Sequence, residues 1–264
     1  MNSYLNVAIK GAIEAGIAIL EIYDKDMEIS QKEDRSPLTA ADLASNKVIN
    51  KHLSGTDIPV ISEENKQIPF GDRKAWNRCW IVDPLDGTKE FIKKNGEFTV
   101  NIAICEAQLP VLGVIYVPVT RELYYADVSE GKAFKTILND EHEIVSGLCA
   151  AEDRIHPASD SNGTIRVVGS RSHMNQDTLD YIDEIKGGYE DVEIVSKGSS
   201  LKFCLVAEGR ADVYPRFAPT MEWDTAAGHA ICRAVGLKVT SQQTKSELLY
   251  NKEDLLNDYF LVAK

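Results

Sequence analysis

The sequence predicts a protein of two parts, an α+β half followed by an α/β half. Several β-favouring runs lie close together between residues 98 and 126, as in a sheet of consecutive strands. Beyond residue 163, β-favouring runs alternate with helical patterns, which is typical of α/β architecture. The intervening residues 137–163 are polar and contain turn-forming residues. We therefore predict an N-terminal sub-domain at residues 1–140 and a C-terminal one at residues 141–264.

The N-terminal half is predicted to begin with two helices. Residues 3–24 form an amphipathic pattern, because apolar side chains recur every three or four positions. These side chains are Leu5, Ile9, Ile13, Ile17 and Leu20. A strand and a loop are expected up to residue 38. Thr39 is then predicted to cap a helix that runs to about residue 53, with Asp42 at its third helical position.

The strands and the later helices follow from short β-favouring runs and from helical periodicity. Strands are predicted at residues 58–61 and 80–82, and the second of them ends at Asp83-Pro84. Further strands are predicted at residues 98–105, 111–117, 123–126, 164–169, 191–195 and 211–214, and further helices at residues 175–186, 199–208 and 223–235.

The bulk composition excludes several classes of protein. The chain has 264 residues, of which 44% are hydrophobic and 27% charged, so we expect a folded protein rather than a disordered one. Its formal net charge of −12 argues against binding to a nucleic acid polymer, which requires a basic surface. The longest apolar stretch near the N-terminus runs only from Ala15 to Leu20. A bilayer requires about 20 apolar residues, so we expect no transmembrane segment.

The five cysteines form no C-x-x-C pair and have apolar neighbours, so reduced and mostly buried thiols are expected. They are Cys79, Cys105, Cys149, Cys204 and Cys232. This usage predicts a cytoplasmic protein. Peripheral association with the cytoplasmic face of the inner membrane stays open, although no basic amphipathic segment supports it.

The strongest chemical signal is the run from Asp83 to Thr88, with the sequence D-P-L-D-G-T. Its proline fixes φ just after a predicted strand, so the carboxylates of Asp83 and Asp86 can turn toward one point. The Leu85 carbonyl between them is a hard oxygen, which Mg²⁺ accepts as a ligand. Gly87 permits close backbone approach, and Thr88 begins a predicted helical turn whose N–H groups face an anion. By itself, the run also fits an acidic turn capped by aspartate.

Two further acidic positions extend this set. Glu63-Glu64 follows a predicted strand, and Asp224 lies in the first turn of a predicted helix, where the helix N-terminus keeps a carboxylate ionised. Clustered carboxylates repel one another, so they either take up protons or bind hard cations. The sequence therefore predicts a Mg²⁺ site. Taken singly, Glu63-Glu64 also fits a solvated acidic loop, and Asp224 also fits a helix cap.

Asp42 and Thr88 form a candidate catalytic pair. A carboxylate that is hydrogen-bonded to a hydroxyl can hold a metal-bound water and orient it toward phosphorus. Their spacing in the sequence does not establish that they meet.

Four motifs together resemble those of the inositol-monophosphatase-like, lithium-sensitive phosphatase family, and the resemblance runs from residue 5 to about residue 262. The motifs are residues 32–42, Ser62-Glu63-Glu64, Asp83 to Thr88 and Glu222-Trp223-Asp224. Residues 198–216 are similar to the bacterial 3′(2′),5′-bisphosphate nucleotidase branch of that family. The resemblance implies a layered αβαβα sandwich of the inositol monophosphatase or fructose bisphosphatase type, with the metal site between two sub-domains.

The resemblance also implies roles for individual residues. The implied metal ligands are Glu64, Asp83, the Leu85 carbonyl, Asp86 and Asp224. The implied catalytic residues are Asp42 and Thr88, which orient the water, together with Glu63. The implied substrate contacts are Glu64, Leu85, Asp86, Gly87, Thr88 and Asp224 around the phosphate, and Ser170, His173, Gly198 and Lys202 around the nucleotide. His173 also fits a surface helix cap, Lys202 and Arg216 also fit exposed charges, and His229 is expected to be a packing residue.

The implied activity is Mg²⁺-dependent hydrolysis of the 3′-phosphate of adenosine 3′,5′-bisphosphate, in sulfur assimilation, with two or three Mg²⁺ ions and inhibition by Li⁺. 3′-Phosphoadenylyl sulfate is a second expected substrate. The alternatives are an inositol or sugar phosphate phosphatase and, more remotely, a non-catalytic nucleotide or metal sensor. We expect a small-molecule nucleotide as the partner, and a monomer or a weak homodimer.

Overall fold

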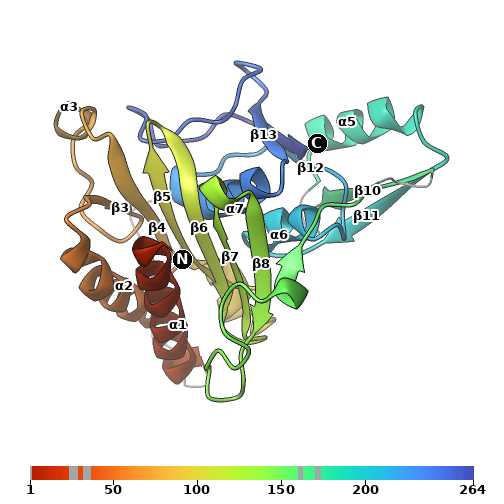
Figure 1. The fold of residues 1–264 in the computed structure, drawn as a ribbon. Helices are drawn as coiled ribbons and strands as arrows, with labels where there is room; N and C mark the ends of the chain where they lie inside the picture. Colours follow the sequence, from red (N-terminus) through yellow and green to blue (C-terminus); the bar gives the residue numbers. More distant parts are fainter. Residues whose placement is uncertain (1, 24–28, 32–36, 160–162, 170–173) are drawn as a thin grey trace.

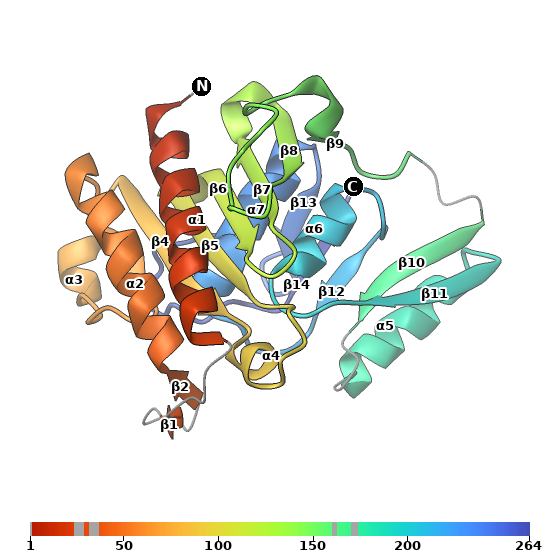
Figure 2. The same cartoon turned by 90° about the horizontal axis from the view of Figure 1, so that it is seen from below.

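The computed structural model describes residues 2–23, 29–31, 37–159, 163–169 and 174–264, and for 29–31 and 37–39 only the backbone. Its elements form five layers, αβαβα, as the family resemblance implies (Figures 1 and 2). In order, the layers are the pair α1 and α2, a seven-stranded sheet, the pair α6 and α7, two small sheets, and α5.

The outer layer consists of α1 (Ser3–Tyr23) and α2 (Ala40–Leu53), which pack on each other and on one face of the large sheet. The short strands β1 (Ile29–Gln31) and β2 (Pro37–Thr39) follow α1 in the chain, precede α2 and pair antiparallel with each other. Helix α1 lies where the hydrophobic periodicity predicts it, α2 follows the predicted cap, and Asp42 is at its third position, as predicted.

The seven-stranded sheet has the order β3-β4-β5-β6-β7-β8-β9, and among its pairs only β3 and β4 run parallel. Its strands are β3 (Val60–Ser62), β4 (Arg78–Asp86), β5 (Thr99–Glu106), β6 (Leu109–Val117), β7 (Glu122–Asp127), β8 (Lys132–Ile137) and β9 (Arg154–Ile155). Helices cover both faces, so the central strands are buried on both sides instead of alternating between buried and exposed.

The middle layer is α6 (Leu201–Ala207) and α7 (Glu222–Ala234), which pack on each other. Helix α7 also crosses strands β4 to β7 of the large sheet. The two approach each other so closely that a Cβ at Gly113 of β6 would overlap the Ala227 carbonyl of α7. This helix therefore holds residues near its N-terminus against the end of β4.

Beyond α6 and α7 lie two small sheets, β10-β11 and β12-β14-β13, with α5 (Gln176–Lys186) on their outer side. Their strands are β10 (Thr164–Gly169), β11 (Asp191–Ser196), β12 (Tyr214–Arg216), β13 (Lys238–Ser241) and β14 (Phe260–Ala263). One hydrophobic cluster draws side chains from both sides of residue 140, for example Ile81 and Phe203. The division into sub-domains at residue 140 stays a prediction.

Three details differ from the sequence-based expectations. Strand β4 does not stop at Asp83-Pro84 but continues to Asp86, because a register shift between these two aspartates lets the strand accommodate the proline. The strand predicted at 211–214 lies at β12, slightly later in the chain. Strands β8, β9, β13 and β14 were not predicted. Among the described residues, no helix is both long and apolar enough to cross a membrane.

Candidate active site

The end of β4 forms an irregular turn that carries two of the predicted ligands. Asp83 pairs with Asn101 of β5 and Asp86 pairs with Thr99, so two residues are taken up between them as a bulge. The Leu85 N–H donates to Asp83 Oδ1 at 3.0 Å, and Ser45 Oγ of α2 donates to the Pro84 carbonyl at 2.6 Å. The Leu85 side chain is buried in the core, so only its backbone is able to serve as a ligand.

Gly87 follows directly and begins the turn into α4 (Thr88–Ile92). Its φ of 92° lies in the region that favours glycine, and a Cβ there would overlap Ser199 Oγ. Thr88 is the first residue of the helix and is partly buried. The expectation that Gly87 permits a close backbone approach therefore holds, although its observed neighbour is a serine of the C-terminal half.

The other acids arrive from three separate elements. Glu63 and Glu64 lie in the turn after β3, and the Glu63 N–H donates to the Val82 carbonyl of β4 at 3.3 Å. Asp42 of α2 is only 2% exposed. Asp224 is the third residue of α7, and its Oδ2 accepts the Met221 N–H at 2.8 Å, as a capping residue does.

These acids lie close enough to one another to affect one another's pKa. Burial raises the pKa of Asp83 well above its usual value, and four neighbouring acids raise it further: Glu63, Asp86, Asp224 and Asp42. Burial and Asp86 also raise the pKa of Asp224, to about 8, against the opposing hydrogen bond from Met221. Four of the predicted acids therefore lie around Asp83, which is 1% exposed.

The donor set fits a hard cation, because it consists of carboxylates and a backbone carbonyl. In the described part of the chain, however, no three His, Cys, Asp or Glu side chains are arranged so that they could hold a metal ion as they stand. The acids affect one another electrostatically, but their carboxylate oxygens do not surround a common position for an ion. We infer that binding a divalent ion requires the carboxylates to draw together, a movement that the loss of their mutual repulsion would favour.

Residues that the sequence reasoning missed fix the position of Asp86. Ser200 Oγ lies 2.7 Å from Asp86 Oδ2 and 3.0 Å from the Asp224 carbonyl, and Asn101 Nδ2 donates to Ser200 Oγ at 2.7 Å. Ser199 Oγ lies 2.9 Å from the Asp86 carbonyl. The only signal in the sequence was the resemblance of residues 198–216, in which only Gly198 and Lys202 were selected.

The predicted nucleotide contacts are placed in part. The Gly198 N–H donates to Glu97 Oε2 at 2.9 Å, and Lys202 Nζ donates to the Ser199 carbonyl at 3.0 Å. Burial lowers the pKa of Lys202. Ser170 and His173 lie outside the described residues.

Lys202 is not the freely exposed charge of the alternative interpretation, because it is half-buried and lines a pocket with Tyr214, Arg216 and Phe217. Among the described residues, the buried Nε of Arg216 has no hydrogen-bond partner, while its Nη2 donates to the Pro219 carbonyl at 3.1 Å. His229 is fully buried, as expected for a packing residue, and contacts Tyr250 and Glu247.

Comparison with known proteins agrees with this geometry. The family model described as "Inositol monophosphatase family" matches residues 1–264. The chain is 48% identical over 256 residues to "3′(2′),5′-bisphosphate nucleotidase CysQ" of Salmonella typhimurium, which covers 96% of both chains. It is 45% identical, with the same coverage, to the protein of that name from Escherichia coli K12.

Among solved structures, the chain is similar to that of CysQ from Bacteroides thetaiotaomicron, a bacterial member of the inositol monophosphatase family. The TM-score is 0.86 at 48% identity, with 100% of this chain and 97% of the other covered. A Bartonella henselae structure, the extragenic suppressor protein suhB, is 24% identical with a TM-score of 0.74 and supports the fold alone. From its full-length sequence match and its architecture, this chain belongs to the inositol monophosphatase family.

Proposed function

We propose that this chain is a Mg²⁺-dependent phosphatase that removes the 3′-phosphate of adenosine 3′,5′-bisphosphate, giving AMP and phosphate. The observation that carries the proposal is the group of acids around Asp83. These acids raise its pKa, and no described lysine or arginine is among the main influences on that pKa. The substrate class is supported by the bisphosphate nucleotidases that are 45–48% identical to this chain. 3′-Phosphoadenylyl sulfate is a second proposed substrate, and the proposed role is in sulfur assimilation.

The proposed ligands of the metal are Glu64, Asp83, the Leu85 carbonyl, Asp86 and Asp224. When bound, Mg²⁺ supplies charge stabilisation and a lowered pKa of the attacking water. Hydrolysis of phosphate monoesters is so slow without a catalyst that the site must remove about 20 kcal/mol of barrier. A single side-chain pair does not provide this, so electrostatics and positioning must carry most of it. The proposed site binds two or three Mg²⁺ ions.

In this proposal, Asp42 and Thr88 orient the nucleophilic water, with Glu63 beside them, and Gly87 and Thr88 contact the phosphate that is cleaved. The partly desolvated Lys202 would meet the second phosphate. Arg216, whose Nε has no hydrogen-bond partner in the described part of the chain, lines the same pocket and would contact the same phosphate. Tyr214 and Phe217 also line this pocket, which has a volume of about 20 Å³ and would have to widen to admit a base.

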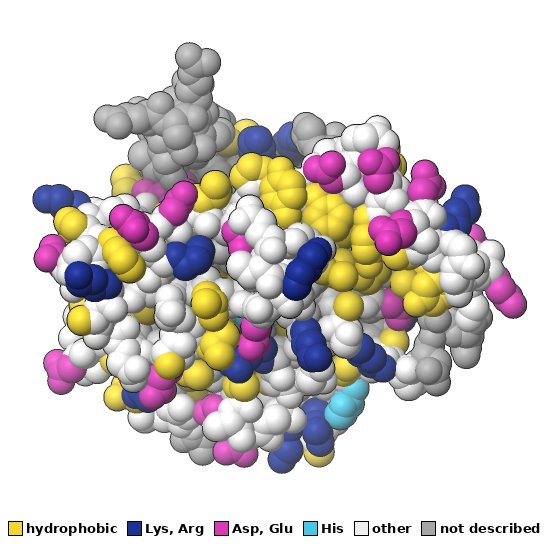
Figure 3. All heavy atoms as spheres, turned by 90° about the horizontal axis from the view of Figure 1, so that it is seen from above, with side chains coloured by type: hydrophobic (Ala, Val, Ile, Leu, Met, Phe, Trp, Pro, Cys, Tyr) yellow, Lys and Arg dark blue, Asp and Glu magenta, His cyan; other side chains and the backbone are white. Residues whose placement is uncertain are grey.

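The partner proposed is a small nucleotide and not a polymer. On the upper face of the molecule, Lys and Arg side chains are interspersed with Asp and Glu (Figure 3). Long nucleic acids would instead require a continuous basic surface. Cytoplasmic location, sensitivity to Li⁺, and a monomer or weak homodimer are further parts of the proposal.

None of the five cysteines forms a disulfide, and only Cys149 is exposed.

A phosphate-release panel tests the proposal. Adenosine 3′,5′-bisphosphate, inositol 1-phosphate and fructose 1,6-bisphosphate are compared with Mg²⁺ and with EDTA. We expect the nucleotide to have the highest kcat/KM and EDTA to abolish turnover. Preference for either of the other phosphates would replace the nucleotidase by a sugar or inositol phosphatase. Tight nucleotide binding without turnover would indicate a sensor.

A further inference from the structure

The loop of residues 63–77 carries Glu63 and Glu64 at one end and Arg73 at the other. Arg73 belongs to the short helix α3 (Phe70–Arg73), and only 3% of it is exposed. At its start, the loop is tied to α2, because Asn46 Nδ2 donates to Asn65 Oδ1 at 3.0 Å. Its far end is held by a different part of the chain.

That part is the segment of residues 250–257, here termed the clasp. Arg73 Nη1 donates to Asn251 Oδ1 at 2.8 Å, and Asn251 Nδ2 donates back to the Arg73 carbonyl at 3.0 Å. Arg73 Nη2 donates to the Glu253 carbonyl at 3.0 Å. The guanidinium and the amide thus join residues 178 positions apart in the sequence.

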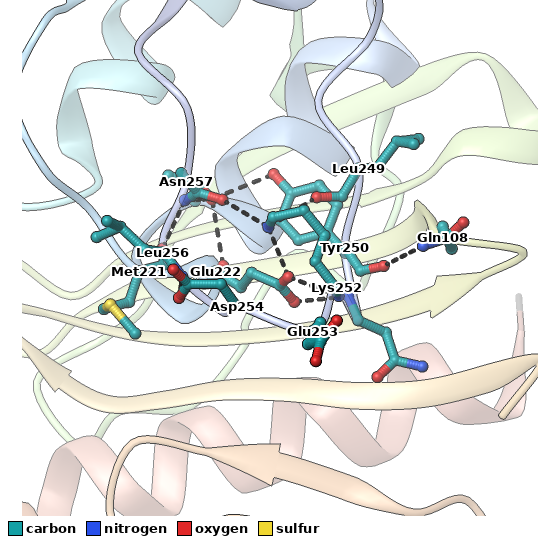
Figure 4. A network of polar contacts seen from close by, with 12 residues as sticks. Gln108, Met221, Glu222, Leu249, Tyr250, Lys252, Glu253, Asp254, Leu256 and Asn257 are labelled. Atoms are coloured by element: carbon teal, nitrogen blue, oxygen red, sulfur yellow. Dashed lines mark hydrogen bonds and ion pairs between the residues drawn. The ribbon is translucent and has the colours of Figure 1, made fainter. Parts of the chain in front are cut away.

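The clasp in turn holds the start of α7 through Glu222, two residues before Asp224. Glu222 Oε2 accepts the Asn251 N–H at 2.6 Å, and Oε1 accepts both the N–H and the Nζ of Lys252, at 3.0 and 2.6 Å. Figure 4 shows Lys252 and Asn257 directed toward this end of the helix. Asn257 Nδ2 donates to the Met221 carbonyl at 2.8 Å.

Asn251 therefore bonds simultaneously to Arg73, from the loop with Glu63 and Glu64, and to Glu222, from the helix with Asp224. From these contacts we propose that Arg73, Asn251 and Glu222 are positioning residues that set the separation of the acids on the two sides of the Mg²⁺ site. The proposal rests on the proposed function. Since the acids must draw together around an ion, a fixed frame behind them limits how far each has to move.

The variant that tests this most directly is Asn251→Gly. It removes both side-chain bonds to Arg73 and keeps the backbone N–H that Glu222 accepts. The φ of Asn251 is 57°, which glycine adopts without strain. We expect the Kd for Mg²⁺, measured by calorimetry without substrate, to rise about 10-fold. The KM for adenosine 3′,5′-bisphosphate at saturating Mg²⁺ should stay within about twofold, because the variant leaves the nucleotide pocket intact.

Arg73→Gln removes the same link from the other side. If the two residues act through each other, the double variant should bind Mg²⁺ no more weakly than the worse of the single variants. Additive effects would show that the two residues do not act as one link, and would overturn the proposal.

Two controls separate positioning from general loss of stability. Leu138→Ala removes buried volume behind the other face of the large sheet, and should lower Tm without changing the Kd for Mg²⁺. Arg78→Gln removes an arginine that pairs with Glu106 at the surface. It should change neither Tm nor the Kd for Mg²⁺. If Asn251→Gly and Leu138→Ala lower Tm alike and neither weakens Mg²⁺ binding, the three residues have only a structural role. If the unchanged protein itself neither binds Mg²⁺ nor hydrolyses the nucleotide, the proposed function fails.

Discussion

Two buried carboxylates of this protein, Glu222 and Asp83, have opposite electrostatic surroundings. Glu222 is 0% exposed, and burial raises its pKa, an effect that its main neighbours, chiefly Lys252, partly offset. Asp83 is 1% exposed, and its neighbours are acids that raise its pKa further. Lys252 and two backbone N–H groups partly offset the charge of the first carboxylate, while the main neighbours of the second all oppose its charge. The difference separates a structural acid from a functional one.

The largest expected effect is that of Asp83→Asn on catalysis. Removing the central carboxylate should leave the fold intact and lower kcat at least 10³-fold, roughly 4 kcal/mol of barrier. In EDTA the variant should be at least as stable as the unchanged protein, because a buried amide requires neither a proton nor a cation to neutralise it. Phosphate release and thermal unfolding measure the two results. Normal Mg²⁺-dependent turnover would remove Asp83 from the site.

Glu222→Ala should give the opposite result for stability in EDTA. It leaves Lys252 and two buried N–H groups without their acceptor, and we expect the free energy of unfolding to fall by about 3 kcal/mol. Urea unfolding of both variants makes the comparison. A loss for Asp83→Asn as large as that for Glu222→Ala would mean that both acids are structural.

Mg²⁺ should stabilise the protein through the Asp83 cluster. At 100 times its Kd, the ion should add about 2.7 kcal/mol to the free energy of unfolding. The increase should be absent in Asp83→Asn and retained in the surface variant Arg78→Gln. An equal increase in all three proteins would place the ion elsewhere.

The metal-free protein should also show a pH-dependent stability. The folded-state pKa of Asp224, about 8, lies well above the usual range of an aspartate. The folded state therefore holds a proton that the unfolded state releases, and stability should fall as pH rises from about 4 to 8. Saturating Mg²⁺ should flatten this slope, because a bound cation replaces the proton. Chemical unfolding at pH 5 and pH 8, with and without Mg²⁺, tests the sign, and higher stability in EDTA at pH 8 would contradict it.

Much of the site was predictable because its signals are local. The spacing of Asp83 and Asp86 around a proline, and the helix-start positions of Asp42 and Asp224, follow from backbone preferences over three or four residues. Lys202 shows the limit of such reasoning. Its partial burial depends on the walls of a pocket, which its own neighbours in the sequence do not specify.

By itself, the sequence determined the helices α1, α2, α5 and α7, most strands of the large sheet and the set of acids, since hydrophobic periodicity and turn chemistry act over short stretches. Only the tertiary structure decided that β4 continues through its proline, that β13 and β14 pair, and that Ser200 meets Asp86. It also brought Arg73 to Asn251. Such pairings join residues tens to almost two hundred positions apart, and a buried polar group finds its partner only when the whole chain has folded.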